Sequence, residues 1–477
     1  MNDCTAVYRY GGIGYMRNIL TLAGLLTLFT VFLAGAGEVH TLTLEESVNL
    51  ALERNPEIAI AEKELAKAGA GIGEAYATIL PSLDANAMVQ HAWDIQTSTI
   101  PNFLKPMLEP LAPTIPEFAD MPDFVDLAFG MENMVTVGLT LSQPLYLGGA
   151  GLSGIRLATA ARNASDRQME STRQSLIYRT ARSFYGCLLA KELMRVQEDA
   201  LEEALANLRV VETRHEVGSA SGFDRMRAEV EVANLKPEVI ASRNSYQSAL
   251  TGMKTILGID SHEEISVLGK LEYRRDDHQG QDLLELQNQA YKRRPDLQAL
   301  RAGKAMAEHS IAIAKSDFLP KVFFSTDWSH QASRNDWDFT SDDFSEGFIS
   351  AISVQVPIFN GLGNIRQYQK TRLDYRIAED RERQLMDTIA AEVELARNGL
   401  FEAEEKYQAA RESIELAHEA LRLANLRYEE GASTQLDVIG SQLSLRRAEL
   451  NHVSALYDYQ MARYELRLVT GTLVDPL

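Results

Sequence analysis

The chain has 477 residues, of which 45% are hydrophobic, and it carries a formal net charge of −20 at pH 7. This apolar content suffices for a sizeable core, whereas the acidic balance leaves no basic surface for binding nucleic acid. Cys4 and Cys187 are the only cysteines. Since Cys187 alone lies beyond the first 36 residues, we expect no intrachain disulfide in the mature part.

The first 36 residues are predicted to be a secretory signal peptide. Arg9 and Arg17 precede an uncharged apolar run at 19–33, and Ala34-Gly35-Ala36 fits a cleavage site. The run has about 15 residues, fewer than the ~20 of an ordinary membrane-spanning helix. The pattern leaves two starts open, Met1 and Met16, because Met-Arg-Asn before the run already forms a sufficient n-region.

The mature part is predicted to consist of two structural repeats, residues 37–264 and 265–477. Each repeat begins with a predicted helix that contains the same short sequence motifs. Residues 51–58 match residues 290–297, and residues 80–83 match residues 319–322, both at an offset of 239. A strand pair and a helical hairpin follow in each repeat. Internal repetition on this scale decides the architecture before any local motif does.

Four segments of about ten residues alternate apolar with polar or small side chains, a pattern typical of membrane-barrel strands. They are residues 81–93 and 134–147 in the first repeat, and 320–330 and 348–359 in the second. Four strands cannot close a barrel, so several chains must share one. Five aromatic residues at the predicted strand ends or in the connecting loops fit a membrane-interface girdle, although soluble strands also favour aromatic residues. They are Trp93, Tyr146, Trp328, Trp337 and Phe359.

The connection at residues 94–133 is longer than its counterpart in the second repeat. The offset falls from 239 to 213 across the strands, which corresponds to 26 additional residues. Six prolines between Pro101 and Pro122 predict a long surface loop. Two interpretations of this loop stay open, an ordinary variable loop and a ligand or receptor site.

The helical hairpins are predicted at residues 148–258 and 361–471. Residues 144–258 align with residues 357–471 without a gap, at a constant offset of 213. Apolar residues recur at spacings of four, seven or eight among Ala, Glu, Arg and Gln, which predicts long helices with a coiled-coil-like seam. The first arm of each hairpin, about 68 residues, would be roughly 100 Å long.

Both hairpins are predicted to turn at the same motif. Residues 214–224 read R-H-E-V-G-S-A-S-G-F-D, and residues 427–437 read R-Y-E-E-G-A-S-T-Q-L-D. Gly218 and Gly431 can adopt the left-handed conformation that ends a helix. A hydroxyl residue three positions before Asp224 or Asp437 predicts a capping box that starts the returning helix.

No pattern in the sequence indicates catalysis, a cofactor or a bound metal. Residues 149–154 read G-A-G-L-S-G, a possible dinucleotide motif, but their copy at 362–367 has none of the three glycines at the required places, and a βαβ unit does not fit a helix of this length. The nine histidines show no paired ligand spacing, and no G-x-S-x-G motif occurs. We therefore predict that the protein is not an enzyme.

Together, the doubled motifs resemble the TolC family of outer-membrane efflux proteins. The resemblance covers almost the whole mature chain and depends on the ordered, repeated set. It implies a mainly α fold with membrane β-strands, in which a homotrimer forms a 12-stranded β-barrel continued by an α-helical tunnel. It also implies an outer-membrane location in a Gram-negative-type bacterium, with the helical part in the periplasm. The implied partners are a periplasmic adaptor (membrane fusion) protein, an inner-membrane pump of the RND or ABC type, and outer-membrane lipid.

The family places the hairpin turns at the periplasmic mouth of the tunnel. Carried over by position, the resemblance makes mouth or gate candidates of Arg214, Gly218, Asp224, Arg427, Tyr428, Gly431 and Asp437. Some members close the mouth with an arginine two residues after the second turn glycine, and place a further aspartate three residues after the first. This chain has Ser433 and Gly440 there. The alternative role of Asp224 and Asp437 is helix capping alone.

The predicted function is a channel-tunnel that exports small molecules or proteins in a tripartite efflux or type I secretion system. The alternative is a soluble periplasmic coiled-coil adaptor, which would explain the helices and the signal peptide but not the four duplicated strands. The cargo and the class of pump stay open.

Overall fold

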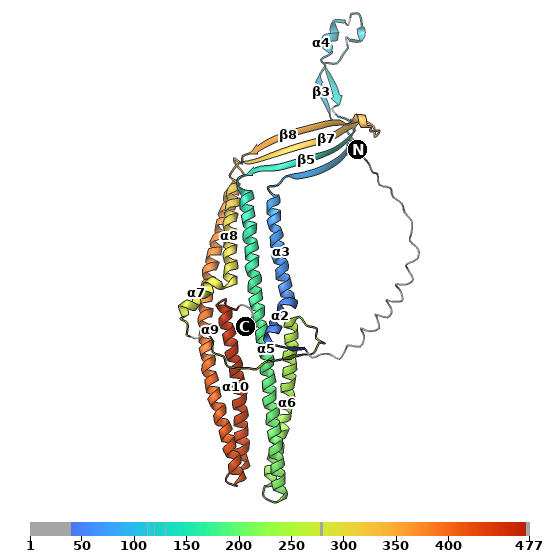
Figure 1. The fold of residues 1–477 in the computed structure, drawn as a ribbon. Coiled ribbons are helices and arrows are strands. Elements are labelled where there is room, and N and C mark those ends of the chain that lie inside the picture. Colours follow the sequence, from blue (N-terminus) through green and yellow to red (C-terminus); the bar gives the residue numbers. More distant parts are fainter. Residues whose placement is uncertain (1–39, 112, 119, 129, 277–279, 474–477) are drawn as a thin grey trace, which may run out of the picture. The chain divides into compact units, whose positions relative to one another are not determined.

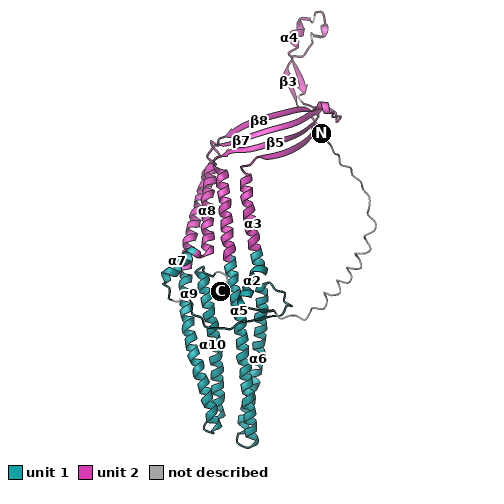
Figure 2. Cartoon of the chain, in the orientation of Figure 1, with its two compact units in different colours: residues 1–59, 172–292, 391–477 teal, residues 60–171, 293–390 magenta. Residues whose placement is uncertain are grey.

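The computed structural model describes residues 40–111, 113–118, 120–128, 130–276 and 280–473. The predicted signal peptide lies outside these residues. The chain divides into two compact units (Figure 2): unit 1 contains residues 1–59, 172–292 and 391–477, and unit 2 contains residues 60–171 and 293–390. Two helices of 67 residues each, α5 (Ala150–Glu216) and α9 (Gly363–Glu429), contribute residues to both units.

Unit 2 is built around a four-stranded antiparallel sheet (Figure 1). Its strands are β2 (Ser82–His91), β5 (Asn133–Leu147), β7 (Lys321–Arg334) and β8 (Ser345–Gln355), in that order across the sheet. Along β2 and β5 the register pairs Leu83 with Leu141 and Val89 with Val135. This pairing keeps the apolar members of the alternating pattern on one face, as a side-chain period of two requires.

The ends of the strands differ from the expected ones in two places. Strand β7 continues to Arg334, so Trp328 pairs in the middle of the strand with Leu139 and Phe348 and does not lie near its end. Strand β8 ends at Gln355, so Phe359 belongs to the connection that leads to α9. Alternation alone cannot place these ends, because it continues into the flanking residues.

The long connection between β2 and β5, predicted from the sequence only as a long surface loop, contains secondary structure of its own. Strands β3 (Thr97–Pro101) and β4 (Phe124–Ala128) form an antiparallel ribbon that projects from the sheet (Figure 1), with the short helix α4 (Lys105–Leu108) beyond it. The side chain of Asn102 closes this region by donating to the Pro122 carbonyl at 3.0 Å. Strands of five residues lack the length from which periodicity is recognised.

Unit 2 also contains α8 (Pro295–Ser316) and all but the first residues of α3 (Pro56–Ala77). Each helix begins at a proline, which suits the first helical position because its missing N–H has no partner there in any case. Helix α8 packs beside the start of α9, where Arg301 and Lys304 both bind the Glu382 carboxylate at 2.8 and 2.7 Å.

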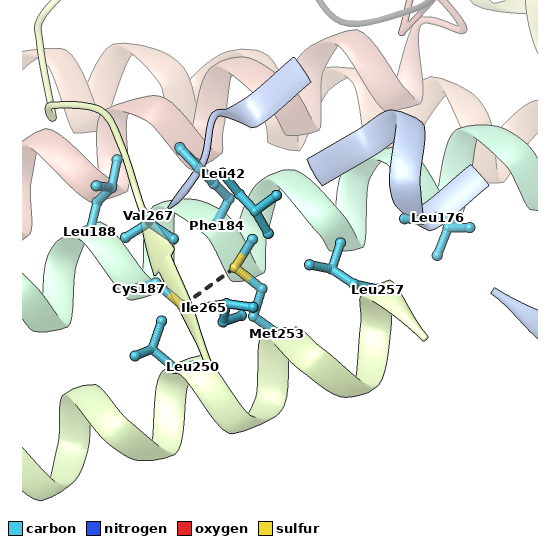
Figure 3. Close-up of a cluster of buried hydrophobic side chains, with 11 residues drawn as sticks. Leu42, Leu176, Phe184, Cys187, Leu188, Leu250, Met253, Leu257, Ile265 and Val267 are labelled. Carbon is cyan, nitrogen blue, oxygen red and sulfur yellow. Dashed lines mark hydrogen bonds between the residues drawn. The ribbon is translucent and has the colours of Figure 1, made fainter. Parts of the chain in front are cut away.

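Unit 1 contains most of the two helical hairpins and the main apolar core. The returning helices are α6 (Gly222–Leu257) and α10 (Gln435–Val469). Figure 3 shows the core, in which α5 and α6 meet the short parallel strands β1 (His40–Leu42) and β6 (Ile265–Val267). The Cys187 thiol contacts the Met253 sulfur at 3.8 Å, and burial raises the pKa of Cys187 to about 12, so this thiol is unreactive.

Helix α2 (Leu44–Arg54) covers the end of the first hairpin. Its last turn is followed by Asn55, whose side chain donates to the Ile256 carbonyl at 2.9 Å and accepts from the Glu57 N–H at 2.8 Å. One amide thus joins the end of α6 to the start of α3. The motif before Pro56 therefore has a structural role at the junction of three helices.

A strap at residues 268–276 holds the second hairpin. The Tyr273 ring stacks on Tyr407 of α9 at 4.7 Å between centroids, and its hydroxyl donates to Glu404 at 2.8 Å. On α10, Arg463 and Arg467 each bind the buried Asp276 carboxylate at 3.2 Å. An ion pair buried in this way strongly disfavours separation of the strap from α10, because either charge left alone would be costly.

Candidate functional site

The candidate site is formed by the tips of the two hairpins in unit 1. Helix α5 ends at Glu216, and Gly218 has a φ of +78°. The Ser219 N–H donates to the Arg214 carbonyl at 2.7 Å, and the Gly218 N–H donates to the His215 carbonyl at 2.9 Å. These two bonds define a Schellman motif, in which a left-handed residue satisfies the last helical carbonyls.

The second hairpin ends in the same way. Gly431 has a φ of +74°, and the N–H groups of Ala432 and Gly431 donate to the carbonyls of Arg427 and Tyr428 at 2.7 and 3.1 Å. The duplicated motif therefore produces a duplicated turn. Positive φ is available to glycine without the steric penalty that other residues meet.

Each returning helix starts with a capping box. In the first hairpin, the hydroxyl and the backbone N–H of Ser221 both donate to Asp224, at 2.7 and 3.1 Å. In the second, the hydroxyl and the backbone N–H of Thr434 donate to Asp437, each at 2.8 Å. The Thr434 backbone and side chain lower the pKa of Asp437, with a smaller contribution from Arg427. Both carboxylates therefore have a capping role, whatever else they do.

The tips touch through Arg214 of α5 and Tyr428 of α9. The Arg214 guanidinium lies 4.4 Å from the centroid of the Tyr428 ring and donates to the Tyr428 carbonyl at 3.3 Å. A cation over an aromatic face stabilises by roughly 0.5–1 kcal/mol at an exposed site. The motif predicted both residues as candidates but not their contact, because a contact between repeats carries no local signal.

Ser433 does not reach the other hairpin. Its hydroxyl donates to the Ala424 carbonyl of α9, in the same hairpin, at 3.4 Å. The position at which some family members carry a closing arginine thus only supports the local turn here. Arg427 is exposed beside it.

Farther from the tips, a polar cavity of about 290 Å³ lies between α5, α6 and α10. Five carboxylates line it, among them Asp199, Glu203, Glu231 and Glu449, together with Ala and Leu side chains and the cationic Arg446. Arg446 lies 3.8 Å from Glu231 and 3.8 Å from Glu238, so it links α10 to α6. Burial raises the pKa of Glu449, and Glu203 contributes in the same direction. No sequence pattern indicates this cavity, because its residues come from three helices.

Four of the five predicted interface aromatics lie at the two ends of the sheet in unit 2, and Trp328 lies within the sheet. At one end, His91 lies 4.5 Å from Trp93 and 5.9 Å from Trp337, measured between ring centroids. At the other end, Tyr146 follows a register shift in β5, and Phe359 is 79% exposed. The Trp328 indole donates to Glu346 at 2.7 Å from within the sheet.

The described residues hold no group of three or more His, Cys, Asp or Glu suited to binding a metal. Within the same ranges, no helix combines the length and the apolar character that crossing a membrane requires.

The chain matches the family described as Outer membrane efflux protein over residues 47–259 and 286–472. It is 23% identical to Outer membrane protein TolC of Vibrio cholerae over 72% of this chain and 78% of the relative. It is 25% identical to the alkaline protease secretion protein AprF of Pseudomonas aeruginosa, over 95% of this chain and 90% of the relative.

Among solved structures, the chain is similar in fold to the Campylobacter jejuni CmeC outer membrane channel. The TM-score is 0.73 at 18% identity, over 91% of this chain and 86% of that one. The expected fold class is therefore confirmed, and the prediction that the protein is not an enzyme is supported, because the members of this family are channels. The chain belongs to the outer membrane efflux protein family and is an outer-membrane channel of an efflux or secretion system.

Proposed function

We propose that three copies of this chain form one channel, in which the hairpin tips are the periplasmic mouth. In this proposal the channel works with a periplasmic adaptor and an inner-membrane pump of the RND or ABC type. The aromatic residues at the two ends of the sheet would contact the membrane interfaces. Cargo of either class, small molecules or proteins, is compatible with a wide tunnel.

The observation that carries the proposal is the pair of sheet edges. Strands β2 and β8 have 10 and 11 residues and are each paired on one side only within the described residues. Unpaired backbone groups are not tolerated in lipid, where each costs several kcal/mol. Since β2 runs antiparallel to β8, the β8 edge of one copy can pair with the β2 edge of the next and continue the antiparallel order.

Such head-to-tail pairing closes into a ring when the rotation between copies allows it. Membrane barrels have at least about eight strands, so four strands per chain require two or more copies. The family relationship favours three.

Disulfide trapping tests this assembly. Asn86→Cys on β2 is combined in turn with a cysteine at each position from Ile349 to Ser353 on β8, and the protein is oxidised in outer membranes. We expect at least one pair to give a ladder that ends at three chains, whereas each single-cysteine variant gives no ladder. A ladder that ends at two chains, or none from any pair, would contradict the trimer.

The contact between Arg214 and Tyr428 would hold the two hairpins together at the mouth. Arg214→Ala removes both the ring contact and the hydrogen bond, so we expect a higher single-channel conductance in planar bilayers. Arg209→Ala is a matched control, because Arg209 is an exposed arginine on the same helix. Equal conductance of the Arg214 and Arg209 variants would remove the gating role.

A further inference from the structure

One face of α10 near its hairpin tip is covered by other parts of the chain. We define the α10 stripe as five residues spaced alternately three and four positions apart, a spacing that places them on one side of a helix. They are Gln435, Val438, Gln442, Leu445 and Glu449. Gln435, Val438 and Leu445 are buried, and the other two are half-buried.

The first repeat shows which segment covers this stripe. At the offset of 213, the equivalent positions of α6 are Gly222, Arg225, Glu229, Val232 and Lys236. All of these are exposed except Val232. The turn and the long arm of the same hairpin occur in both repeats, so they would cover both stripes alike. The additional burial of the α10 stripe is therefore due to the first hairpin.

The polar cavity supports this assignment. Gln442, Leu445 and Glu449 of the stripe line it together with residues of α5 and α6. The stripe thus faces the first hairpin, and Gln435 is its member closest to the tip. Gln435 lies seven positions after Tyr428, whose ring contacts Arg214 of the first hairpin.

The Gln435 amide is enclosed without a hydrogen bond. The residue is 3% exposed, and neither its amide oxygen nor its amide nitrogen has a hydrogen-bond partner among the described residues. Burying such groups unpaired costs free energy, because their bonds to water are lost and not replaced. Movement of α10 away from the first hairpin would return the amide to water. The cost is therefore present only while the two hairpins are packed together.

Helix capping does not explain a glutamine at this position. The capping box of α10 consists of Thr434 and Asp437, and the Gln435 side chain takes no part in it. The equivalent position in the first repeat is Gly222, which follows the same type of turn. The turn therefore needs no side chain at this position.

We infer that Gln435 is a positioning residue that keeps the packing of the two hairpins reversible near their tips. Its unpaired amide opposes the contact between Arg214 and Tyr428, which holds the same ends together. The two contributions have opposite signs, so the free-energy difference between packed and separated tips stays small. The inference rests on the proposed function, in which separation of the tips opens the periplasmic mouth.

The expected effect follows from the cost of an unpaired group. Leaving one buried hydrogen-bonding group without a partner shifts an equilibrium by about five- to a hundredfold. Methionine is unbranched like glutamine and fills irregular apolar spaces without this requirement. Gln435→Met should therefore favour the packed tips by at least about fivefold.

The test measures how often the stripe becomes accessible. Val438 is 2% exposed, so the thiol of Val438→Cys can be alkylated by a small maleimide only when the hairpins separate. The alkylation rate is measured for the full-length protein in outer-membrane vesicles, with Gln435 and with Gln435→Met. Cys187 is buried and unreactive, which keeps the background low.

Two controls match this measurement. Gln442→Met makes the same exchange one heptad farther along the stripe, where the residue is half-buried at the polar cavity. It should not slow the alkylation of Val438→Cys. Val232→Cys reports on the packing of α6 against α5 within the first hairpin. Its alkylation should be equally fast with either residue at position 435.

We expect Gln435→Met to slow the alkylation of Val438→Cys by about fivefold or more. Gln435→Leu should act in the same direction and replaces the methionine variant if that protein does not fold. Unchanged or faster alkylation would overturn the inference, because the amide would then support the packing. In planar bilayers, the same variant should spend less time in its most conducting state. Slower alkylation with unchanged currents would support the role of Gln435 in hairpin packing and contradict the proposed mouth instead.

Discussion

The duplicated glycines Gly148 and Gly361 provide a direct comparison between backbone strain and steric exclusion. Both lie between a strand and a long helix, at equivalent positions of the two repeats, and their φ values are +63° and +65°. A Cβ atom added at Gly361 would meet no heavy atom within 4 Å. Alanine there should cost only the left-handed backbone strain, about 1–2 kcal/mol.

At Gly148 the same atom would lie 2.7 Å from the Ser316 carbonyl oxygen and 3.0 Å from Leu319 Cβ. The Ser316 carbonyl accepts a hydrogen bond from the Leu319 N–H at 3.0 Å, and Ser316 is buried. The backbone must therefore shift against an existing turn, which adds about 1–3 kcal/mol. We expect Gly148→Ala to be clearly more destabilising than Gly361→Ala.

The two variants can be compared by the temperature at which the folded oligomer is lost in detergent, in parallel with the wild type. Both should unfold below the wild type, with Gly148→Ala the lower. Equal midpoints would refute the reasoning, because the two sites share their backbone conformation and differ mainly in the neighbour of the added atom. A lower midpoint for Gly361→Ala would refute it as well.

Two further predictions concern charges in unit 1. Asp276→Ala leaves Arg463 and Arg467 without their shared carboxylate, so the free energy of unfolding should fall by about 3–5 kcal/mol in denaturant titrations followed by circular dichroism. The control Asp458→Ala removes an exposed carboxylate on the same helix as the arginines and should change the free energy of unfolding little. Equal losses of stability in the two variants would argue against the buried ion pair. For Glu449, burial raises the pKa in the folded state, so its ionised form destabilises the fold increasingly as pH rises from about 4.3, the unfolded pKa, through the folded pKa. Glu449→Gln should therefore be more stable than the wild type at pH 7. When the pH falls from 7 to 5, the variant should gain less stability than the wild type. A steeper dependence of stability on pH in the variant would contradict a raised pKa of Glu449.

The features that the sequence predicted well depend on local or periodic signals. Two such features are the left-handed turns at Gly218 and Gly431 and the capping boxes at Asp224 and Asp437. Their hydrogen bonds join residues at most five positions apart, so the local sequence is enough to predict them. The two long helices follow from a seam repeated over many turns. The fold class could be predicted because the motifs occur twice and in the same order, and the family match confirms it.

What the sequence could not predict involves contacts between distant segments. The strap places Tyr273 on Tyr407, a contact across more than a hundred residues with no periodic signal. Strands β1 and β6 have three residues each, too few to show alternation. The stacking of Arg214 on Tyr428 required knowledge of how the two repeats pack. Tertiary contacts of this kind are decided by the three-dimensional neighbourhood and not by local propensity.

The equal length of α5 and α9, 67 residues each, limits how this protein can change during evolution. A single inserted residue in α5 would rotate every following side chain by about 100° and turn its seam away from its neighbours. A tolerated change would have to add or remove whole heptads, in α5 and its returning partner α6 together. The same step would be needed in α9 and α10, or Arg214 and Tyr428 would no longer lie at one level. The two repeats can therefore diverge in sequence, but their lengths can change only together.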